Sequence, residues 1–396
     1  AIKDNYNLEG TITTAGSKML KNYRSPYTAT AVQKVIDAGG IIVGKTNLDE
    51  FAMGSSTENS AFGVTKNPID TTRVAGGSSG GSAAAVLMNG ALASLGSDTG
   101  GSIRQPSSFC GLVGLKTTYG AVSRFGLMSM GTSLDQIGPI AKTVEDVEVI
   151  FNTISGYDKF DSTSVPDSFR VNKNKTKKII GVPYSFIQRD GIDKEVLENF
   201  KETIKKLESQ GYEIKDIDLP YLKYSLAVYY ILMPAEVSSN LARYDGVRYG
   251  VREEGNNLLD TYEKTRGVGF GKETRRRIIL GTYVLSSGYY DAYYNKANSV
   301  RSLIEQDFKN AFENVDVIAM PTTPSPAFKI GEKSNNPLKM YLADIFTVPV
   351  NLAGVPAISI PSGVTKDGLP LGFQFIAPWW GENTLFEIGK KIDSGI

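Results

Sequence analysis

The sequence predicts an α/β protein: a single large domain with a central mixed sheet covered by helices on both faces. Apolar residues recur at helical spacing in several stretches, and these alternate with short apolar runs typical of buried strands. Similar runs return near the end of the chain, which favours one sheet over separate domains. The 396 residues, 41% of them hydrophobic, are enough to form a large core.

The first elements follow from local signals. Ser25 before Pro26 is typical of a helix start, and glycines at 39–40 predict the end of that helix. Residues 41–44 predict a short buried strand. Residues 82–95 are small and apolar throughout, which predicts a helix packed on all sides.

Further along, the pattern predicts a helix that begins at Asp193 and ends at Gly211. Residues 219–312 change to long helical stretches rich in Tyr and Arg, and we interpret them as a helical insertion within one domain that spans residues 1–396. The basic residues of 170–178 are interpreted as a solvated loop. Strands are predicted at 178–182, 212–214, 315–321, 356–361 and 371–376.

Composition excludes several kinds of protein. The chain has no His, so a Ser-His-Asp triad and a His metal site are both excluded. Its one cysteine, Cys110, excludes an internal disulfide and a Cys-cluster metal site and fits a reducing compartment. The 43 basic and 42 acidic residues leave a net charge of +1, which argues against nucleic-acid binding as the main task. No apolar run reaches the roughly 18 residues that a membrane span needs.

Two Gly/Ser segments, residues 76–82 and 96–102, carry the chemical signal. Consecutive glycines let backbone N–H groups converge on a phosphate or a developing oxyanion. The phosphate alternative lacks both the P-loop and the dinucleotide patterns. Residues 76–80 match G-x-S-x-G, but that motif needs a His partner, so we treat the match as coincidental.

Without His, a serine can be activated by a neutral, buried lysine. The amine must lose its proton near neutral pH, which requires desolvation or a nearby cation. Lys3 is a candidate because it follows two apolar residues suited to a strand.

Residues 76–85, 96–106, 110–120 and 134–139 together resemble the amidase signature family, and the resemblance extends over nearly the whole chain. It implies a Ser-Ser-Lys triad. Ser102 would be the nucleophile, and Ser78 would relay its proton to Lys3. The peptide bond before Ser78 would be cis. The N–H groups of Thr99, Gly100 and Gly101 would form the oxyanion hole.

Other segments resemble, within that family, the A subunits of glutamyl-tRNA(Gln) amidotransferases: residues 45–54, 238–250 and 341–351. This resemblance implies a glutaminase that supplies ammonia to a transamidase, the B subunit. The B subunit would hold ATP and Mg²⁺ and make most of the contacts with the tRNA. A small C subunit would stabilise the complex of the two. It implies no cofactor or metal in this chain and a location in the bacterial cytoplasm or a mitochondrial or plastid matrix. The alternatives are a stand-alone amidase acting on small or fatty amides and a non-catalytic scaffold. Whether Asp-tRNA(Asn) is also served stays open.

The resemblance further implies an acid and a base that bind the α-groups of glutamine. We place these on Asp344 and Arg277, although Arg275 and Arg276 are alternatives within the same run. Asp98 and Arg104 flank the nucleophile, either bracing its loop or forming an ordinary ion pair. The family also has a helical segment before the Lys-bearing strand, so residues are expected before Ala1 in the whole protein.

Overall fold

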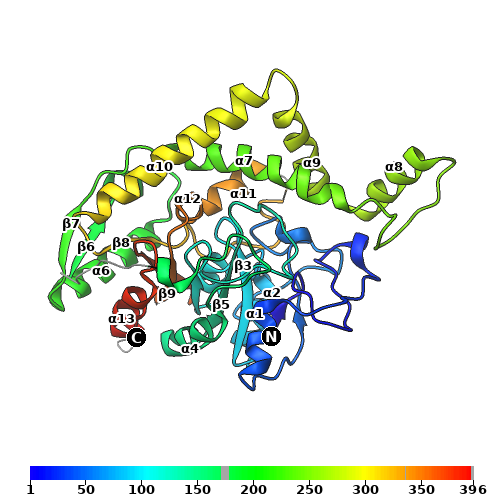
Figure 1. Ribbon diagram of the computed structural model, residues 1–396. Helices are drawn as coiled ribbons and strands as arrows, with labels where there is room; N and C mark the ends of the chain where they lie inside the picture. The colour runs from blue at the N-terminus through cyan, green and yellow to red at the C-terminus, as the bar shows by residue number, and fades with distance from the viewer. Residues whose placement is uncertain (171–177, 335, 394–396) are drawn as a thin grey trace.

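The computed structural model describes residues 1–170, 178–334 and 336–393. Ten strands of these residues form one mixed sheet in the order β2-β1-β3-β5-β4-β9-β10-β8-β6-β7 (Figure 1). β1 is parallel to both of its neighbours and β6 to both of its own, whereas the middle of the sheet is antiparallel. The strands are β1 (Ile2–Lys3), β2 (Lys45–Thr46), β3 (Ala93–Asp98), β4 (Val113–Lys116), β5 (Gln136–Ala141), β6 (Ile179–Val182), β7 (Glu213–Asp216), β8 (Val317–Pro321), β9 (Ala357–Val364) and β10 (Pro370–Ile376).

Helices cover both faces of this sheet, which confirms the predicted α/β class. The α-helices of the described residues are α1 (Thr30–Asp37), α2 (Gly80–Leu87), α3 (Arg104–Phe109), α4 (Val144–Ile154), α5 (Tyr184–Ile187), α6 (Lys194–Ser209), α7 (Ser225–Asn240), α8 (Leu258–Gly269), α9 (Lys272–Leu285), α10 (Lys296–Phe312), α11 (Pro337–Tyr341), α12 (Val348–Ala353) and α13 (Glu382–Asp393). In the described part of the chain, none is both long and apolar enough to cross a bilayer.

Strand β10 shows how the two faces divide. The ring of Phe373 stacks on Phe200 of α6, with 5.1 Å between centroids. The next residue, Gln374, accepts a hydrogen bond from Arg104 of α3. Because successive strand residues point to opposite faces, α6 and α3 lie on opposite sides of the sheet. α2 packs with α3, whereas α4 and α13 pack on the side of α6.

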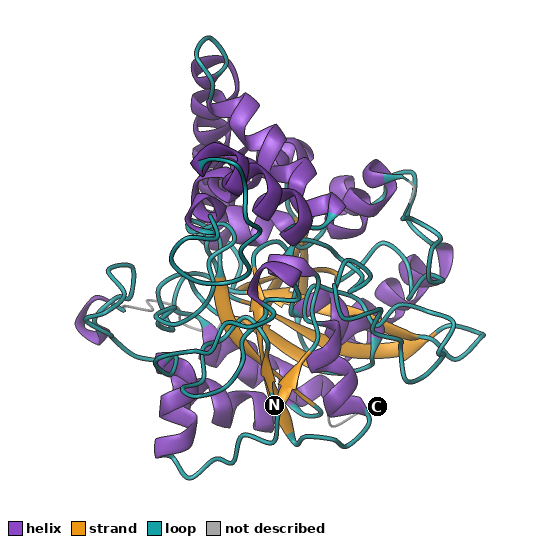
Figure 2. Cartoon of the chain, turned by 90° about the vertical axis from the view of Figure 1, so that its right-hand side faces the viewer, coloured by secondary structure: helices purple, strands orange, loops and turns teal. Residues whose placement is uncertain are grey.

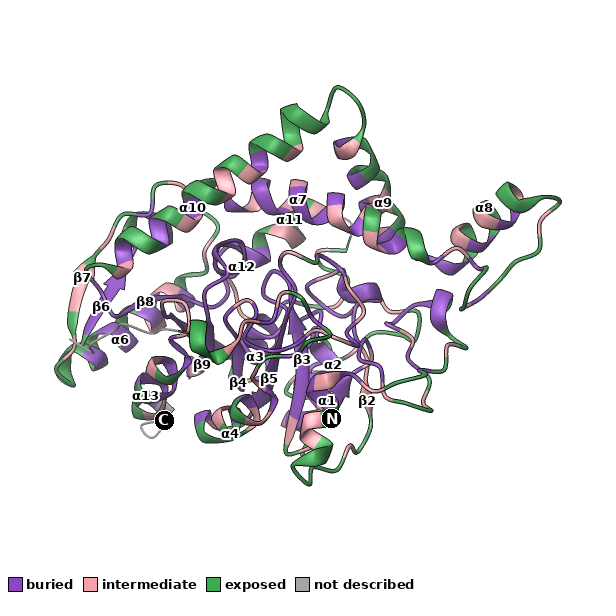
Figure 3. Ribbon diagram, in the orientation of Figure 1, coloured by how far each residue is buried: buried purple, intermediate pink, exposed green. Residues whose placement is uncertain are grey.

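Helices α7, α9 and α10 form a layer of their own beyond the sheet. α7 packs against both α9 and α10, and α12, which packs on α7 and α10, is hydrogen-bonded to the end of β3 through Asn351 and Asp98. Figure 2 shows these helices stacked beyond the strands, and α8 projects away from them in Figure 1. Figure 3 shows that the central strands are buried, whereas α8 and α10 expose much of their outer surface. The strands that follow this layer, β8 to β10, return to the same sheet.

Two of the early predictions are wrong. The first helix begins at Thr30, not Pro26, because the backbone of Ser25 is paired with residues 10 and 11 and its hydroxyl with Thr13. Residues 41–44 are not a buried strand: Ile41 is 86% exposed and Val43 63% exposed. Within the part of the chain that the structure describes, residues 41–44 have no strand to pair with, because β1 has only two residues and both pair with Lys45–Thr46.

The predicted helix over residues 82–95 is also too long. α2 ends at Leu87, Asn89 adopts a left-handed conformation with φ of 61°, and β3 begins at Ala93. Periodicity does not separate a short apolar helix from a buried strand, so the turn at Asn89 was missed.

The later elements lie where they are predicted. Asp193 caps α6 by accepting a hydrogen bond from the N–H of Glu195 at 2.8 Å. Gly211 follows the helix with φ of 86°, a conformation that glycine adopts without strain. β6 to β10 match the predicted strands within three residues at each end. Of the basic stretch 170–178, residues 171–177 lie outside the described ranges.

Candidate active site

Lys3 lies on β1, where parallel pairing with β2 and β3 fixes its backbone. Its side chain is fully buried, and Nζ lies 2.7 Å from Ser78 Oγ and 2.9 Å from Ser97 Oγ. Burial lowers the pKa of Lys3 to about 7, an effect that nearby carboxylates oppose. A substantial fraction of this amine is therefore neutral at physiological pH and able to accept a proton.

Ser78 and Ser102 lie on two loops that meet beside Lys3. Ser78 is fully buried just before α2, and its peptide bond to Gly77 is cis, as expected. Ser102 is 8% exposed just before α3, and its carbonyl accepts a hydrogen bond from Ser79 N at 3.2 Å. Within the described residues no hydrogen bond joins the Ser102 and Ser78 hydroxyls. Lys3 and Ser78 are thus in direct contact through their side chains. Ser102 is connected to the Ser78 loop by the hydrogen bond from Ser79 N to the Ser102 carbonyl.

The loop between β3 and α3 holds the three expected oxyanion donors. Gly101 has φ of 136°, and a Cβ there would lie 2.3 Å from Thr347 Oγ1, so only glycine fits. Its N–H already donates to Asp98 Oδ1 at 2.7 Å. Across the described ranges, no protein acceptor is found for the N–H groups of Thr99 and Gly100. These two remain the candidates for binding an oxyanion.

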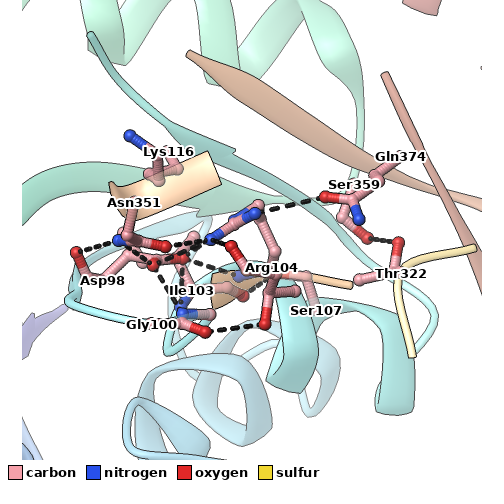
Figure 4. A network of polar contacts seen from close by, with 12 residues as sticks. Asp98, Gly100, Ile103, Arg104, Ser107, Lys116, Thr322, Asn351, Ser359 and Gln374 are labelled. Carbon is pink, nitrogen blue, oxygen red and sulfur yellow. Dashed lines mark hydrogen bonds and ion pairs between the residues drawn. The ribbon is translucent and has the colours of Figure 1, made fainter. Parts of the chain in front are cut away.

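A buried ion pair braces this loop (Figure 4). Arg104 Nε lies 3.1 Å from Asp98 Oδ2, and neither side chain is exposed. Asn351 donates to Asp98 and accepts from Arg104, and Gln374 accepts a further bond from Arg104. Burial alone would raise the pKa of Asp98, but Arg104 holds it at about 2. Because Asp98 also accepts from two N–H groups of the nucleophile loop, the pair fixes that loop as well as balancing charge.

Arg277 and Asp344 come together from distant parts of the chain. Arg277 lies on α9, 4% exposed, with Nε 2.8 Å from Glu273 Oε1. Asp344 accepts a hydrogen bond from Ser55 Oγ at 2.6 Å and a longer one from the Tyr230 hydroxyl at 3.4 Å. The guanidinium of Arg277 also lies over the Tyr230 ring, at 5.8 Å, so this tyrosine links the two.

The charge state of each group follows from its surroundings. Burial raises the pKa of Asp344 to about 7, although Ser55 and Arg277 favour the carboxylate. Burial works against the charge of Arg277, but Glu273 raises the pKa of Arg277 above its usual value. Arg275 is exposed and Arg276 half-buried, so Arg277 is the arginine of this run that lies inside.

Two residues near Arg277 and Asp344 contact the loop that carries Ser102. Thr347, three residues after Asp344, donates its hydroxyl to the carbonyl of Gly100 at 2.6 Å. A Cβ on Gly100 would lie 2.8 Å from the hydroxyl oxygen of Tyr229 on α7, so that helix also packs directly on the loop. The predicted residues thus form one connected site.

Sequence reasoning missed several residues around this site: Ser55, Ser97, Tyr229, Tyr230, Glu273, Tyr341, Thr347 and Asn351. Ser97 lies inside the second Gly/Ser segment, which is a signal that could have found it. Tyr229 and Tyr230 lie in a long aromatic-rich helical stretch, where sequence alone does not tell a site residue from a core residue.

Comparisons with known proteins fit this arrangement. The amidase family profile matches residues 1–386. The A subunit of glutamyl-tRNA(Gln) amidotransferase from Thermodesulfovibrio yellowstonii is 57% identical over 393 residues, covering 98% of this chain and 81% of the relative. The protein of that name from Sulfurihydrogenibium is 57% identical over 400 residues, covering 100% of this chain and 82% of its own length.

Solved structures agree. The crystal structure of the glutamyl-tRNA(Gln) amidotransferase A subunit from Thermotoga maritima has a TM-score of 0.85 and 47% identity, covering 100% of this chain and 82% of that one. A crystal structure described as an amidase has a TM-score of 0.82 and 28% identity, covering 99% of this chain and 83% of that one. The chain therefore belongs to the amidase family, with relatives among the A subunits of glutamyl-tRNA(Gln) amidotransferases.

Proposed function

We propose that this chain is the glutaminase subunit of a tRNA-dependent amidotransferase. The observation that carries the proposal is the contact between a fully buried, readily neutralised Lys3 and Ser78, next to the loop of Ser102. The buried Arg277 and Asp344 add one group of each charge beside that loop, which suits the α-carboxylate and α-amino groups of glutamine.

In the proposed reaction, Ser102 Oγ attacks the side-chain amide carbon of glutamine. As the new C–O bond forms, the Ser102 proton passes to Ser78 Oγ and the Ser78 proton passes to Lys3 Nζ. The two hydroxyls come into contact when substrate is bound, since catalytic hydrogen bonds often tighten only then. The N–H groups of Thr99 and Gly100 stabilise the oxyanion.

The intermediate then collapses and the C–N bond breaks. The leaving nitrogen takes back a proton along the same relay and departs as ammonia, leaving an ester on Ser102. Water, deprotonated through Ser78 and Lys3, attacks this ester; as the C–O bond to Ser102 breaks, Ser102 Oγ regains that proton through Ser78 and glutamate is released. Ammonia would pass to the partner transamidase, the B subunit, which binds ATP, Mg²⁺ and most of the tRNA, for the conversion of Glu-tRNA(Gln) to Gln-tRNA(Gln). A small C subunit completes the proposed complex, in a bacterial cytoplasm or an organelle matrix.

The test is co-purification of the whole complex, followed by an ammonia assay with glutamine, with and without charged tRNA. Ammonia release that depends on glutamine and is lost in Ser102→Ala would support the proposal. Cleavage of simple amides by the isolated chain, with no preference for glutamine, would favour a stand-alone amidase. Unchanged ammonia release after Ser102→Ala would remove the mechanism altogether.

A further inference from the structure

Glu50 is a buried acid that joins three segments of the chain. The residue is 3% exposed, and its carboxylate accepts three hydrogen bonds. Oε1 accepts from Ser17 Oγ at 2.5 Å, and Oε2 accepts from Gly271 N at 2.8 Å and Thr274 Oγ1 at 2.6 Å. None of these donors is near Glu50 in sequence, so the bonds are purely tertiary.

Two of the three donors lie at the start of α9. Gly271 is the residue that precedes the helix and Thr274 lies in its first turn. Gly271 has no side chain to cap the helix, so Glu50 supplies the acceptor and the negative charge that a helix N-terminus favours. Arg277 follows Thr274 by three residues and so lies on the same side of the helix. Glu50 therefore holds the turn that directly precedes the proposed substrate-binding arginine.

The residue before Glu50 holds the other half of the site. Asp49 accepts hydrogen bonds from the N–H groups of Thr57 at 2.8 Å and Asn59 at 3.1 Å, and its own N–H donates to the carbonyl of Ser78 at 3.3 Å. The loop that it shapes carries Ser55, which binds Asp344. Adjacent acids thus connect the relay loop with the helix that recognises substrate.

The backbone that presents Glu50 is strained. Phe51 and Ala52 have φ of 49° and 63°, a left-handed conformation unfavourable for residues other than glycine. Phe51 packs against Phe270, the residue before Gly271, with 5.8 Å between ring centroids. This packing and the three hydrogen bonds compensate for the strain, and they lock the Glu50 turn to the start of α9.

We propose that Glu50 is a positioning residue for glutamine recognition: it fixes the first turn of α9 and so sets the place of the Arg277 guanidinium relative to Ser102. The assignment rests on the proposed glutaminase function. Glu50 contacts neither the relay nor the oxyanion donors, so its loss acts on substrate affinity rather than on the chemical step.

The test is Glu50→Gln in the assembled complex, a substitution that keeps size and one acceptor oxygen. KM for glutamine is expected to rise about tenfold while kcat stays within about twofold. Butyramide has the same reacting group but no α-amino or α-carboxylate group, so its kcat/KM should change less than about twofold. In an Arg277→Ala background, Glu50→Gln should add less than about twofold to KM, because both changes act through one contact.

Asp316→Asn is the matched control. Asp316 is also a buried acid that accepts a backbone hydrogen bond, from Ile179 N at 2.9 Å, and KM for glutamine should not change. If Glu50→Gln does not fold, Thr274→Val removes one donor to the same carboxylate and should raise KM by a smaller factor. Additive effects of the Glu50 and Arg277 substitutions, or equal losses with glutamine and butyramide, would overturn the assignment. A wild-type complex that releases no ammonia from glutamine would instead overturn the proposed function.

Discussion

Replacing Lys3 with methionine tests the proton acceptor of the proposed relay, because methionine has similar length but cannot bind a proton. Lys3 is fully buried, and its pKa in the folded protein is about 7 against an ordinary 10.5, chiefly through burial of the charge. Between these two pH values, folding removes a proton from Lys3. The residue therefore makes the stability of the protein depend on pH.

The sign and the size of this dependence follow from the two pKa values. The unfolded chain keeps the Lys3 proton up to pH 10.5, whereas the folded protein loses it near pH 7. The free energy of unfolding therefore rises with pH between these two values, and the full cost of burying a charged Lys3 is present below pH 7. At about 1.4 kcal/mol per pKa unit, the penalty falls from about 5 kcal/mol at pH 6 to about 2 kcal/mol at pH 9. Hydrogen bonds lost with the side chain do not titrate in this range, so they cancel when the two conditions are compared.

The assay is urea unfolding of the wild type and of Lys3→Met at both pH values. The stability of the variant relative to the wild type should fall by about 3 kcal/mol between pH 6 and pH 9. Hydrolysis of glutamine should be lost in the variant, and in the wild type kcat at saturating glutamine should drop about tenfold per pH unit below pH 7. Lys201→Met, which removes an exposed lysine on α6, is the control. It should change neither the pH dependence of the stability nor the rate of glutamine hydrolysis. A relative stability that is the same at both pH values, or acylation that survives in Lys3→Met, would refute the reasoning.

Three further substitutions test other parts of the site. Asp98→Asn leaves Arg104 buried without its counter-charge and should lower the free energy of unfolding by about 3–5 kcal/mol in urea titrations; a loss below about 1 kcal/mol would show that the pair does not brace the loop. Gly101→Ala places a methyl group against Thr347 and should reduce kcat by at least about 100-fold at unchanged oligomeric state, measured by steady-state kinetics. Asp344→Asn removes a charged hydrogen-bond acceptor and should raise KM for glutamine about 10- to 100-fold, whereas a fall in kcat alone would contradict a binding role.

The sequence predicted the fold class and the later strands because periodicity and capping signals were clear there, as at Asp193. It failed at residues 41–44, since an apolar run does not reveal how many partner residues a neighbouring strand offers. The apolar neighbours of Lys3 made it a candidate, but only the family resemblance selected it, because a lone lysine is normally exposed.

The recognition side of the site was harder to predict. Nothing in the run Arg275–Arg277 shows which arginine faces inward, since that depends on how α9 packs on α7. The sequence also could not show whether the Gly101 N–H is free to bind an oxyanion. That N–H donates to Asp98 because of the geometry of one turn. Local patterns predict elements, whereas the geometry of individual turns and the contacts between distant elements decide which groups are left free.

The proposed base, Lys3, and one of the proposed recognition groups, Arg277, belong to different parts of this molecule. Lys3 is anchored to a strand clamped on both sides, whereas Arg277 and Tyr230 are presented by a separate stack of helices. Remodelling that stack could exchange one amide for another while the proton-transfer machinery stayed where it is. A designer seeking new substrates should therefore vary α7 and α9 and leave the strand scaffold alone.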